Sequence, residues 1–552
     1  MSTTTQDTPA PAASAELVVL TKSSADAASA DGSLASAVSQ HGLDLRPLFP
    51  DLDAEASASA SSAIPEPGAW FFATGDEDDL TPLAATLRER ADVEAAYVKP
   101  AAEPAVVDTT LAPPDLSELL TDVDEHVAPA PQAEAPAAGK YVSRQNYLDP
   151  APVGIDASYA GTRNGGLGDG IKVIDCEWGW QFNHHDLAQN NLGLVGGTND
   201  SNTDHGTAVM GEIGGDHNSF GVDGISPNAR LGASSVNGQG TAGAMVKAAQ
   251  NLIAGDILLI EMHRRGPNGT QPPQQGYIAM EWWPDDFAAI RYAVDRGIIV
   301  VEAAGNGWEN LDASIYNTPG AGFPSSWRNP FRISNPSSGA VMVGAGSPPA
   351  GTHGRNTSPW NLPYVDRARC GFSNYGSRVD AQGWGWEVTT CGYGDLYNSG
   401  GATQLYTDIF AGTSSASPIV VGALAATQGV LKAANMPLMT SDRARQLVRS
   451  TGSPQQAAPG RPTSQRIGNR PNLRQLIPAA LKQTVRAKVT HCYALTGAQQ
   501  AFAHVEGIGW RRIKTGSADG VSNTLDACMQ AQLRGASVAL NIDDSTLYYV
   551  YS

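Results

Sequence analysis

The 552-residue sequence contains few cysteines, no apolar run long enough to cross a membrane, and no cluster of positive charge. The missing apolar run argues against a transmembrane protein. The scattered Lys and Arg residues argue against a nucleic-acid-binding protein, which needs them gathered in a stripe or patch. Residues 1–14 also lack the basic start and apolar middle of a secretory signal, which is compatible with a cytoplasmic or a non-classically exported protein and leaves the compartment open.

Cysteine usage leaves the redox state of the chain open. None of the cysteines belongs to a Cys-x-x-Cys zinc pattern; they are Cys176, Cys370, Cys391, Cys492 and Cys528. Cys370 could pair with Cys391, or Cys492 with Cys528, in an oxidising compartment. Separate reduced thiols are the alternative.

Negative charge is concentrated in the N-terminal quarter of the chain. Up to Ala138 there are 24 Asp and Glu against 5 Lys and Arg, so this part carries the whole formal charge of −19. Residues 1–100 alternate short apolar strands with a helical pattern and predict a small α+β domain. Residues 101–138 are rich in Pro, Ala, Asp and Glu and predict a flexible acidic linker.

The pattern changes over residues 139–481, where short apolar strands alternate with helices. This alternation is typical of an α/β fold in which helices cover both faces of a parallel sheet. In such folds the active site gathers at the carboxyl ends of the strands. Residues 485–552 predict a further small α+β module, with a helix over 524–533 and a hairpin after it, to which the sequence assigns no function.

Two candidate catalytic residues stand where a loop runs into a helix. Ser414 lies in Gly412-Thr413-Ser414-Ser415-Ala416-Ser417-Pro418. A serine at a helix N-terminus can project its hydroxyl into a cleft, where free backbone N–H groups stabilise an oxyanion. His205 lies in Asp204-His205-Gly206-Thr207, whose small residues let another helix approach the imidazole. Alone, each would be an ordinary cap or a structural histidine; the complete strings favour a catalytic site.

Two further candidates end strand-like runs. Asp175 follows the apolar run 171–174, where its carboxylate would accept a hydrogen bond from the imidazole and fix its tautomer. Asn306 follows the run 300–305, where its amide can donate to an oxyanion.

These strings, in the order Asp, His, Ser, resemble those of the subtilisin-like serine proteases, the subtilases of peptidase family S8. Residues 372–376 (Phe-Ser-Asn-Tyr-Gly) and 221–229 resemble two further landmarks of that family. The resemblance covers residues 139–481 and implies a three-layer subtilisin-like fold with a parallel sheet.

The resemblance implies a serine endopeptidase that hydrolyses polypeptides through an acyl-enzyme. Asp175, His205 and Ser414 would form the catalytic triad, and Asn306 would hold the oxyanion. Activity is expected to rise through about pH 6–8 as His205 becomes neutral. No cofactor is required; calcium is common in relatives, but the sequence identifies no ligand set for it.

Two departures from the family pattern concern the site itself. Cys176-Glu177-Trp178 follows Asp175, where the family usually has Ser or Thr and then Gly. Glu261, Met262 and His263 stand where the family often has a Ser-Leu-Gly run that pairs with substrate backbone. We therefore predict these three as substrate-binding residues, and their larger side chains call the family's ordinary substrate preference into question.

The N-terminal domain resembles a subtilase propeptide, whose last segment lies in the cleft like a product. We therefore expect an autoinhibited precursor, with its own N-terminal domain as inhibitor, that is cleaved within residues 101–138. A regulatory tail is the alternative interpretation of this domain. Two other functions also stay open: a catalytically inactive binding protein that keeps the fold, and a maturation protease of narrow specificity.

Overall fold

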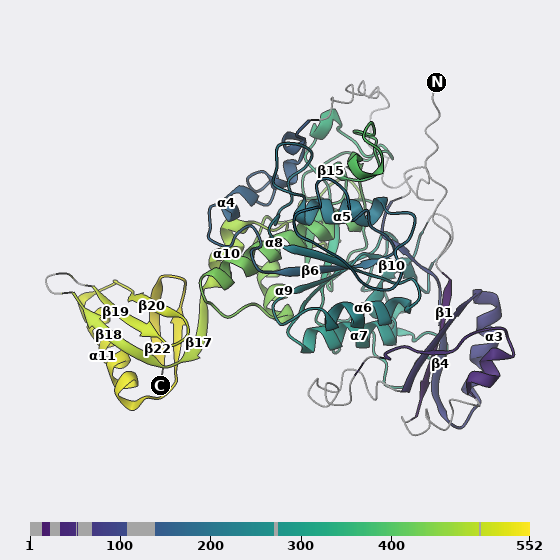
Figure 1. Ribbon diagram of the computed structural model, residues 1–552, viewed down its shortest axis with the longest axis horizontal. Helices are drawn as coiled ribbons and strands as arrows, with labels where there is room; N and C mark the ends of the chain where they lie inside the picture. The colour runs from purple at the N-terminus through teal and green to yellow at the C-terminus, as the bar shows by residue number, and fades with distance from the viewer. Residues whose placement is uncertain are drawn as a thin grey trace.

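The computed structural model describes residues 14–22, 34–50, 52, 69–107, 139–269, 274–495, 498 and 500–551. Figure 1 shows an N-terminal unit at the lower right, a large central unit, and a C-terminal module at the left.

A seven-stranded sheet forms the middle of the central unit, in the order β14-β13-β12-β9-β6-β8-β7. All of its neighbouring strands run parallel. The strands are β6 (Lys172–Glu177), β7 (Asn191–Gly196), β8 (Arg230–Ser235), β9 (Ile257–Ile260), β12 (Ile299–Ala303), β13 (Val341–Gly346) and β14 (Ala381–Trp384). Every residue of β9, β12 and β13 is buried, as a sheet covered on both faces requires.

Helices cover both faces of this sheet (Figure 1). α5 (Asp204–Gly214) and α8 (Thr413–Ala433) lie on one face, and α6 (Gly240–Gln250) and α7 (Pro284–Asp295) lie on the other. Because successive side chains of a strand point to opposite faces, Val173 packs into the core under α5 and α8, while Ile174 packs against α6 and α7. The three-layer α/β architecture predicted from the sequence is confirmed.

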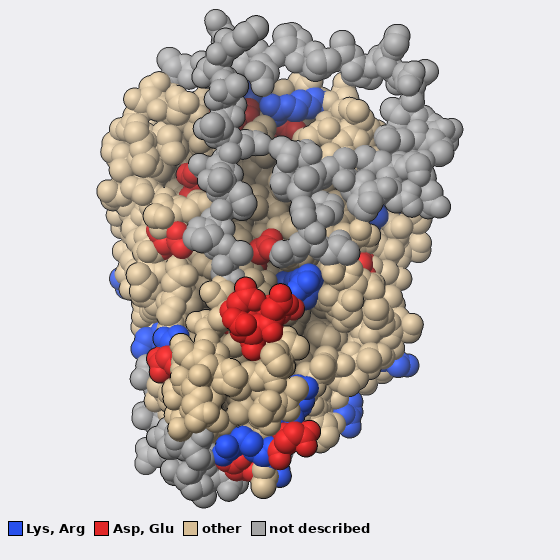
Figure 2. Space-filling view, turned by 90° about the vertical axis from the view of Figure 1, so that its right-hand side faces the viewer, with Lys and Arg blue, Asp and Glu red and all other residues tan. Residues whose placement is uncertain are grey.

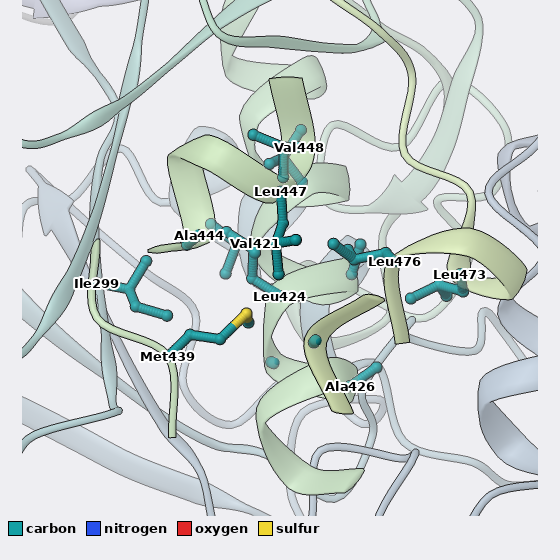
Figure 3. Close-up of a cluster of buried hydrophobic side chains, with 14 of the residues drawn as sticks. Ile299, Val421, Leu424, Ala426, Met439, Ala444, Leu447, Val448, Leu473 and Leu476 are labelled. Atoms are coloured by element: carbon teal, nitrogen blue, oxygen red, sulfur yellow. The ribbon is translucent and has the colours of Figure 1, made fainter. Parts of the chain in front are cut away.

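Helix α8 is the centre of the hydrophobic core. It is long and apolar enough to cross a membrane by length and composition, but its apolar window is wholly buried inside the protein, as in the core helix of a globular unit. Figure 3 shows Val421 and Leu424 of α8 facing α9 (Ser441–Ser450) and α10 (Leu473–Leu481). Smaller elements of the central unit are α4 (Ala157–Gly161), β15 (Val388–Cys391) and β16 (Tyr406–Phe410).

The N-terminal unit is an antiparallel sheet with one long helix. Its strands are ordered β2-β3-β1-β4: β1 (Ala15–Thr21), β2 (Arg46–Pro47), β3 (Trp70–Gly75) and β4 (Val93–Lys99). Helix α3 (Glu77–Arg88) begins at the capping residue Asp76, whose carboxylate accepts from the Asp78 N–H (2.9 Å). Figure 2 shows this side of the molecule, where charged side chains form small separate groups rather than a continuous stripe.

A buried lysine attaches the N-terminal unit to the central one. Lys99, fully buried at the end of β4, donates to Thr241 Oγ1 at the start of α6 (2.9 Å). Its ammonium also pairs with Asp285 and Asp286 in the first turn of α7. The contact joins the two units through charges that are all removed from water.

The prediction of a flexible linker over residues 101–138 is wrong for its first residues. Residues 101–107 continue into the central unit, where β5 (Ala102–Pro104) pairs antiparallel with β10 (Met262–Arg265). On its other side β10 pairs with β11 (Tyr277–Ala279). A Pro- and Ala-rich segment is extended here because β10 offers it an open edge. Residues 108–138 of the predicted linker lie outside the described residues.

The C-terminal module is a six-stranded sheet, ordered β17-β21-β22-β20-β19-β18, packed against α11 (Ala518–Arg534). Its strands are β17 (Gln483–Ala487), β18 (Val489–Ala494), β19 (Ala501–Val505), β20 (Gly509–Ile513), β21 (Val538–Ile542) and β22 (Thr546–Tyr551). The predicted helix and hairpin are both present. The thiols of Cys492 and Cys528 are hydrogen-bonded neighbours, and all five cysteines are free.

Shortening a core side chain of α8 should weaken the fold. Leu424 is fully buried among α9 and α10 side chains, so Leu424→Ala should lower the free energy of unfolding by about 2–5 kcal/mol. Ile333→Ala, whose side chain is 68% exposed, should change it by less than about 0.5 kcal/mol. Equilibrium urea unfolding measures both, with Ser414→Ala in every protein to prevent self-cleavage. Equal midpoints for the two variants would contradict this packing.

Candidate active site

The four predicted catalytic residues lie at the carboxyl edge of the sheet. Asp175 lies on β6, His205 opens α5, Asn306 follows β12 and Ser414 opens α8. All four are buried, and His205, with 8% of its surface exposed, is the most accessible of them. The sheet therefore brings together groups that are up to 239 residues apart in the sequence.

The imidazole of His205 is hydrogen-bonded to Glu177, whereas the sequence predicts Asp175 as its partner. Nδ1 of His205 lies 2.6 Å from Oε2 of Glu177. The reason is the length of β6. The sequence predicts that this strand ends before Asp175, but it continues to Glu177. Side chains two residues apart on a strand share a face, so both carboxyl groups face α5. Cys176 points to the opposite face, where its Sγ lies 3.7 Å from the carbonyl oxygen of Ala244.

Asp175 lies behind Glu177 and is hydrogen-bonded to it. The indole Nε1–H of Trp180 donates to Oδ2 of Asp175 (2.8 Å). Burial, and then the neighbouring Glu177, raise the pKa of Asp175 well above its usual range. Burial raises the pKa of Glu177 to about 8, and the hydrogen bond from Asp175 acts in the opposite direction. At a pH between their two pKa values, two carboxyl groups this close hold one proton. Their hydrogen bond raises the pKa of Asp175 and lowers that of Glu177, which places this proton on Asp175.

Because the pKa of Glu177 is raised less than that of Asp175, Glu177 is the first of the two acids to ionise and the one that can carry charge beside the imidazole. A protonated Asp175 donates to the Glu177 carboxylate, which then accepts from Nδ1–H of His205. This tautomer leaves Nε2 of His205 as the basic nitrogen, the arrangement that a general base needs. Burial lowers the pKa of His205 to about 4, which favours the neutral imidazole. Nε2 of His205 and Oγ of Ser414 are not hydrogen-bonded to each other in this structure.

The two predicted oxyanion donors converge on a carbonyl of the chain itself. The carbonyl oxygen of Ala105 accepts from Nδ2 of Asn306 (2.5 Å) and from the backbone N–H of Ser414 (3.4 Å). Thr413 fixes the amide of Asn306, because its N–H and its hydroxyl both donate to Oδ1 of Asn306, each at 2.9 Å. The amide N–H groups of Asn306 are therefore turned toward Ala105.

Glycine is required in the turn before Ser414. Gly412 has a φ of +126°, which residues with a side chain rarely adopt. A Cβ at this position would lie 2.3 Å from the carbonyl oxygen of Ala105. The turn thus exposes the start of α8 and leaves room for the backbone that passes in front of it.

The three predicted substrate-binding residues all contact this segment. Met262 and His263 pair with Pro104 and Glu103 in the β10–β5 ladder, and the carbonyl oxygen of Glu261 accepts from the Ala105 N–H (3.4 Å). The side chain of Glu261 instead accepts from the hydroxyl of Ser417 (2.6 Å). Nδ1 of His263 accepts from the backbone N–H of Asn306 (3.2 Å), so this ring positions Asn306.

In the sequence Glu177 stands out only as a departure from the family pattern, and no role was predicted for it. The spacing could have predicted its position, because a residue two positions after Asp175 lies on the same face of the strand if the strand continues. Trp180 and Thr413 were likewise not predicted, since only the folded structure brings them to Asp175 and Asn306. Within the described residues no group of three or more His, Cys, Asp or Glu side chains could hold a metal ion, and calcium binding stays a prediction.

Fold and site together define a serine peptidase built on a three-layer α/β unit. The family model of Peptidase S8, the subtilase family, matches residues 106–472, more than half of the chain. The chain therefore belongs to the subtilase family and is a subtilisin-like serine peptidase, a hydrolase.

Known relatives agree with this assignment. Subtilisin NAT from Bacillus subtilis subsp. natto is 26% identical over 316 residues, which are 56% of this chain and 67% of that protein. An alkaline protease from Alkalihalobacillus alcalophilus is 32% identical over 281 residues, 50% of this chain and 58% of that protein.

Two solved structures can be aligned with most of the chain. The epidermin leader peptide processing serine protease from Staphylococcus aureus aligns with 85% of this chain and 99% of that one, at 17% identity and a TM-score of 0.49. Fervidolysin from Fervidobacterium pennivorans aligns with 91% of this chain and 69% of that one, at 14% identity and a TM-score of 0.49. The family assignment rests on the sequence comparisons alone.

The lowered pKa of His205 changes the pH range predicted from the sequence. Because kcat reports the complex with a filled cleft, which the structure represents, two groups shape its acid limb: Glu177, whose pKa burial raises to about 8, and His205, whose pKa burial lowers to about 4. The neutral base should therefore be lost only below pH 6.5, and a fall of kcat between pH 8 and 6 reports protonation of Glu177. The pH dependence of kcat on a saturating peptide, compared between the wild type and Glu177→Gln, tests this; a midpoint above 6.5 in Glu177→Gln would contradict it.

Proposed function

We propose that this chain is a serine endopeptidase made as a precursor that cuts itself between Ala105 and Val106. This proposal rests on the carbonyl oxygen of Ala105, which accepts hydrogen bonds from Nδ2 of Asn306 and from the backbone N–H of Ser414. Val106, on the far side of that carbonyl, forms a bridge with Gly412 beside the nucleophile. The chain thus crosses the cleft as a substrate would, with the peptide bond after Ala105 at the catalytic groups.

The mechanism follows from the roles of the surrounding groups. Oγ of Ser414 attacks the carbonyl carbon of Ala105, and Nε2 of His205 takes the hydroxyl proton. Asn306 and the Ser414 N–H stabilise the negative charge that develops on the carbonyl oxygen. His205 then protonates the amine of Val106, which leaves, and water hydrolyses the acyl-enzyme in a second round of the same proton transfers.

The N-terminal unit acts as an inhibitor until it leaves. Its segment 102–105 fills the cleft on the side of the substrate's acyl part, and its Lys99 is tied to α6 and α7. Cleavage after Ala105 breaks the covalent connection but none of these contacts. The family model begins its match at residue 106, the first residue of the proposed mature enzyme.

Self-cleavage should produce a mature chain that begins at Val106. Intact-mass analysis and N-terminal sequencing of purified protein should find this new N-terminus, whereas Ser414→Ala should stay full length. Ser415→Ala is the matched control, because that hydroxyl donates to the carbonyl oxygens of Trp384 and Gly412 instead of facing the segment; this variant should still be cut. Asn306→Ala should slow cleavage by about 10²–10³, the loss found for such a donor in subtilisin.

These measurements also separate the alternatives. A cut at another bond would overturn the assignment of Ala105–Val106, and processing of Ser414→Ala would remove Ser414 as the nucleophile. A wild-type chain that is neither cut nor labelled by a fluorophosphonate would be the inactive binding protein.

We further propose that Glu177, rather than Asp175, supplies the charge of the triad. Glu177→Gln keeps the shape but removes the carboxylate beside the imidazolium, so kcat should fall by about 10²–10⁴. Asp175→Asn keeps a donor toward Glu177 and an acceptor for Trp180, so kcat should fall by no more than about tenfold.

The two variants are matched, since each replaces one acid of the pair with its amide. Peptide hydrolysis by both proteins decides between the acids, and circular dichroism checks that each is folded. The opposite order, a severe loss in Asp175→Asn and a mild one in Glu177→Gln, would return the triad's charge to Asp175.

A further inference from the structure

The side chain of Glu103 is bound by two groups of the central unit. Its Oε1 accepts from the hydroxyl of Tyr277 (2.9 Å), and its Oε2 accepts from Nε2 of Gln274 (2.7 Å). Glu103 lies two residues before Ala105, so it occupies the third position on the acyl side of the proposed cleavage site, P3. Both carboxylate oxygens of this P3 residue are therefore satisfied by donors that belong to the enzyme.

The register of the small sheet explains why these donors reach Glu103. Glu103 pairs with His263 on β10, and Arg265, two residues further along β10, pairs with Tyr277 on β11. Side chains of Glu103, His263, Arg265 and Tyr277 thus share one face of the sheet. The ring of Tyr277 is buried against that of His263, with centroids 4.9 Å apart, which fixes the direction of its hydroxyl.

Positive charge lies on the same face. The guanidinium of Arg265 forms an ion pair with Glu77, which belongs to the acidic first turn of α3 in the N-terminal unit. When the N-terminal unit leaves, Glu77 leaves with it and Arg265 stays on β10. The mature enzyme then presents this cation on the face that binds the P3 side chain.

We propose that the mature protease selects substrates with an acidic residue at P3, recognised by Tyr277 and Gln274 with Arg265 nearby. This inference rests on the proposed function, because it treats segment 102–105 as a bound substrate. Glutamate is favoured over an uncharged side chain because two donors meet its two oxygens, and hydrogen bonds to a charged group are the stronger ones. Lysine at P3 is disfavoured, because its ammonium group cannot accept hydrogen bonds from Tyr277 and Gln274.

Four quenched fluorescent peptides of the sequence Ala-Xaa-Pro-Ala-Val-Val test this subsite, with Xaa as Glu, Gln, Ala or Lys. For processed wild-type enzyme, kcat/KM should be highest with Glu and about tenfold lower with Ala. The Gln peptide should be intermediate, since its amide has only one oxygen to accept a hydrogen bond from the two donors. The Lys peptide should be the poorest substrate.

The variant Tyr277→Phe removes one donor and keeps the ring that packs on His263. It should reduce the preference for Glu over Ala at P3, measured as the ratio of the two kcat/KM values, to about threefold. Tyr493→Phe, on a 43% exposed tyrosine of the C-terminal module, is the matched control and should keep the wild-type preference.

The outcomes separate the subsite from the peptidase assignment. Equal cleavage of the Glu and Ala peptides, or an unchanged preference in Tyr277→Phe, would overturn the P3 subsite while leaving the proposed function intact. Failure to cut any peptide, together with no fluorophosphonate labelling, would overturn the proposed function and this inference with it.

Discussion

The catalytic edge of this protein depends on burying ionisable side chains in pairs. Asp175, Glu177, His205, Glu261 and His263 are all at least 92% buried, and an unpaired charge in such a place is strongly unfavourable. Each is therefore joined to a neighbour: Asp175 to Trp180 and Glu177, Glu177 to His205, Glu261 to Ser417, and His263 to the N–H of Asn306. The catalytic geometry follows from these pairings, because a side chain that must keep its partner has few positions available.

The same constraint governs how the N-terminal unit is attached. Lys99, Asp285, Asp286 and Arg264 are fully buried and Glu16 nearly so, and the five form one network across the boundary between the units. Removing one member of such a network leaves the others uncompensated, which costs more than the intact network contributes. The N-terminal unit is thus bound by this network, by the ion pair between Glu77 and Arg265, and by the strand in the cleft. The proposed cut after Ala105 breaks none of these contacts, so under that proposal cleavage and release are separate steps.

Much of this arrangement could be predicted from the sequence, but its most informative contacts could not. The parallel sheet and the positions of His205, Asn306 and Ser414 follow from apolar periodicity and from strings of small residues around each polar group. Glu177 was missed because the polar residues Asp175 to Glu177 look like the end of a strand, whereas burial under α5 extends β6 across them. The strand at residues 102–104 was missed because the composition of this segment is that of a linker, although the resemblance to a propeptide implied that the last segment of the N-terminal domain lies in the cleft. Only the open edge of β10, which no local pattern of the segment reveals, makes it a strand.

Substrate binding and oxyanion positioning are joined through one residue. The backbone of His263 pairs with Glu103 in the β10–β5 ladder, while its ring accepts the N–H of Asn306 and packs against Tyr277. A peptide that pairs with β10 therefore fixes the strand that carries this ring. The ring in turn fixes the loop from which Asn306 donates, and Thr413 connects that loop to the start of α8. The chain of contacts thus runs from Glu103 through His263 and Asn306 to the start of α8, so under the proposed function the P3 residue and the oxyanion donor are positioned together.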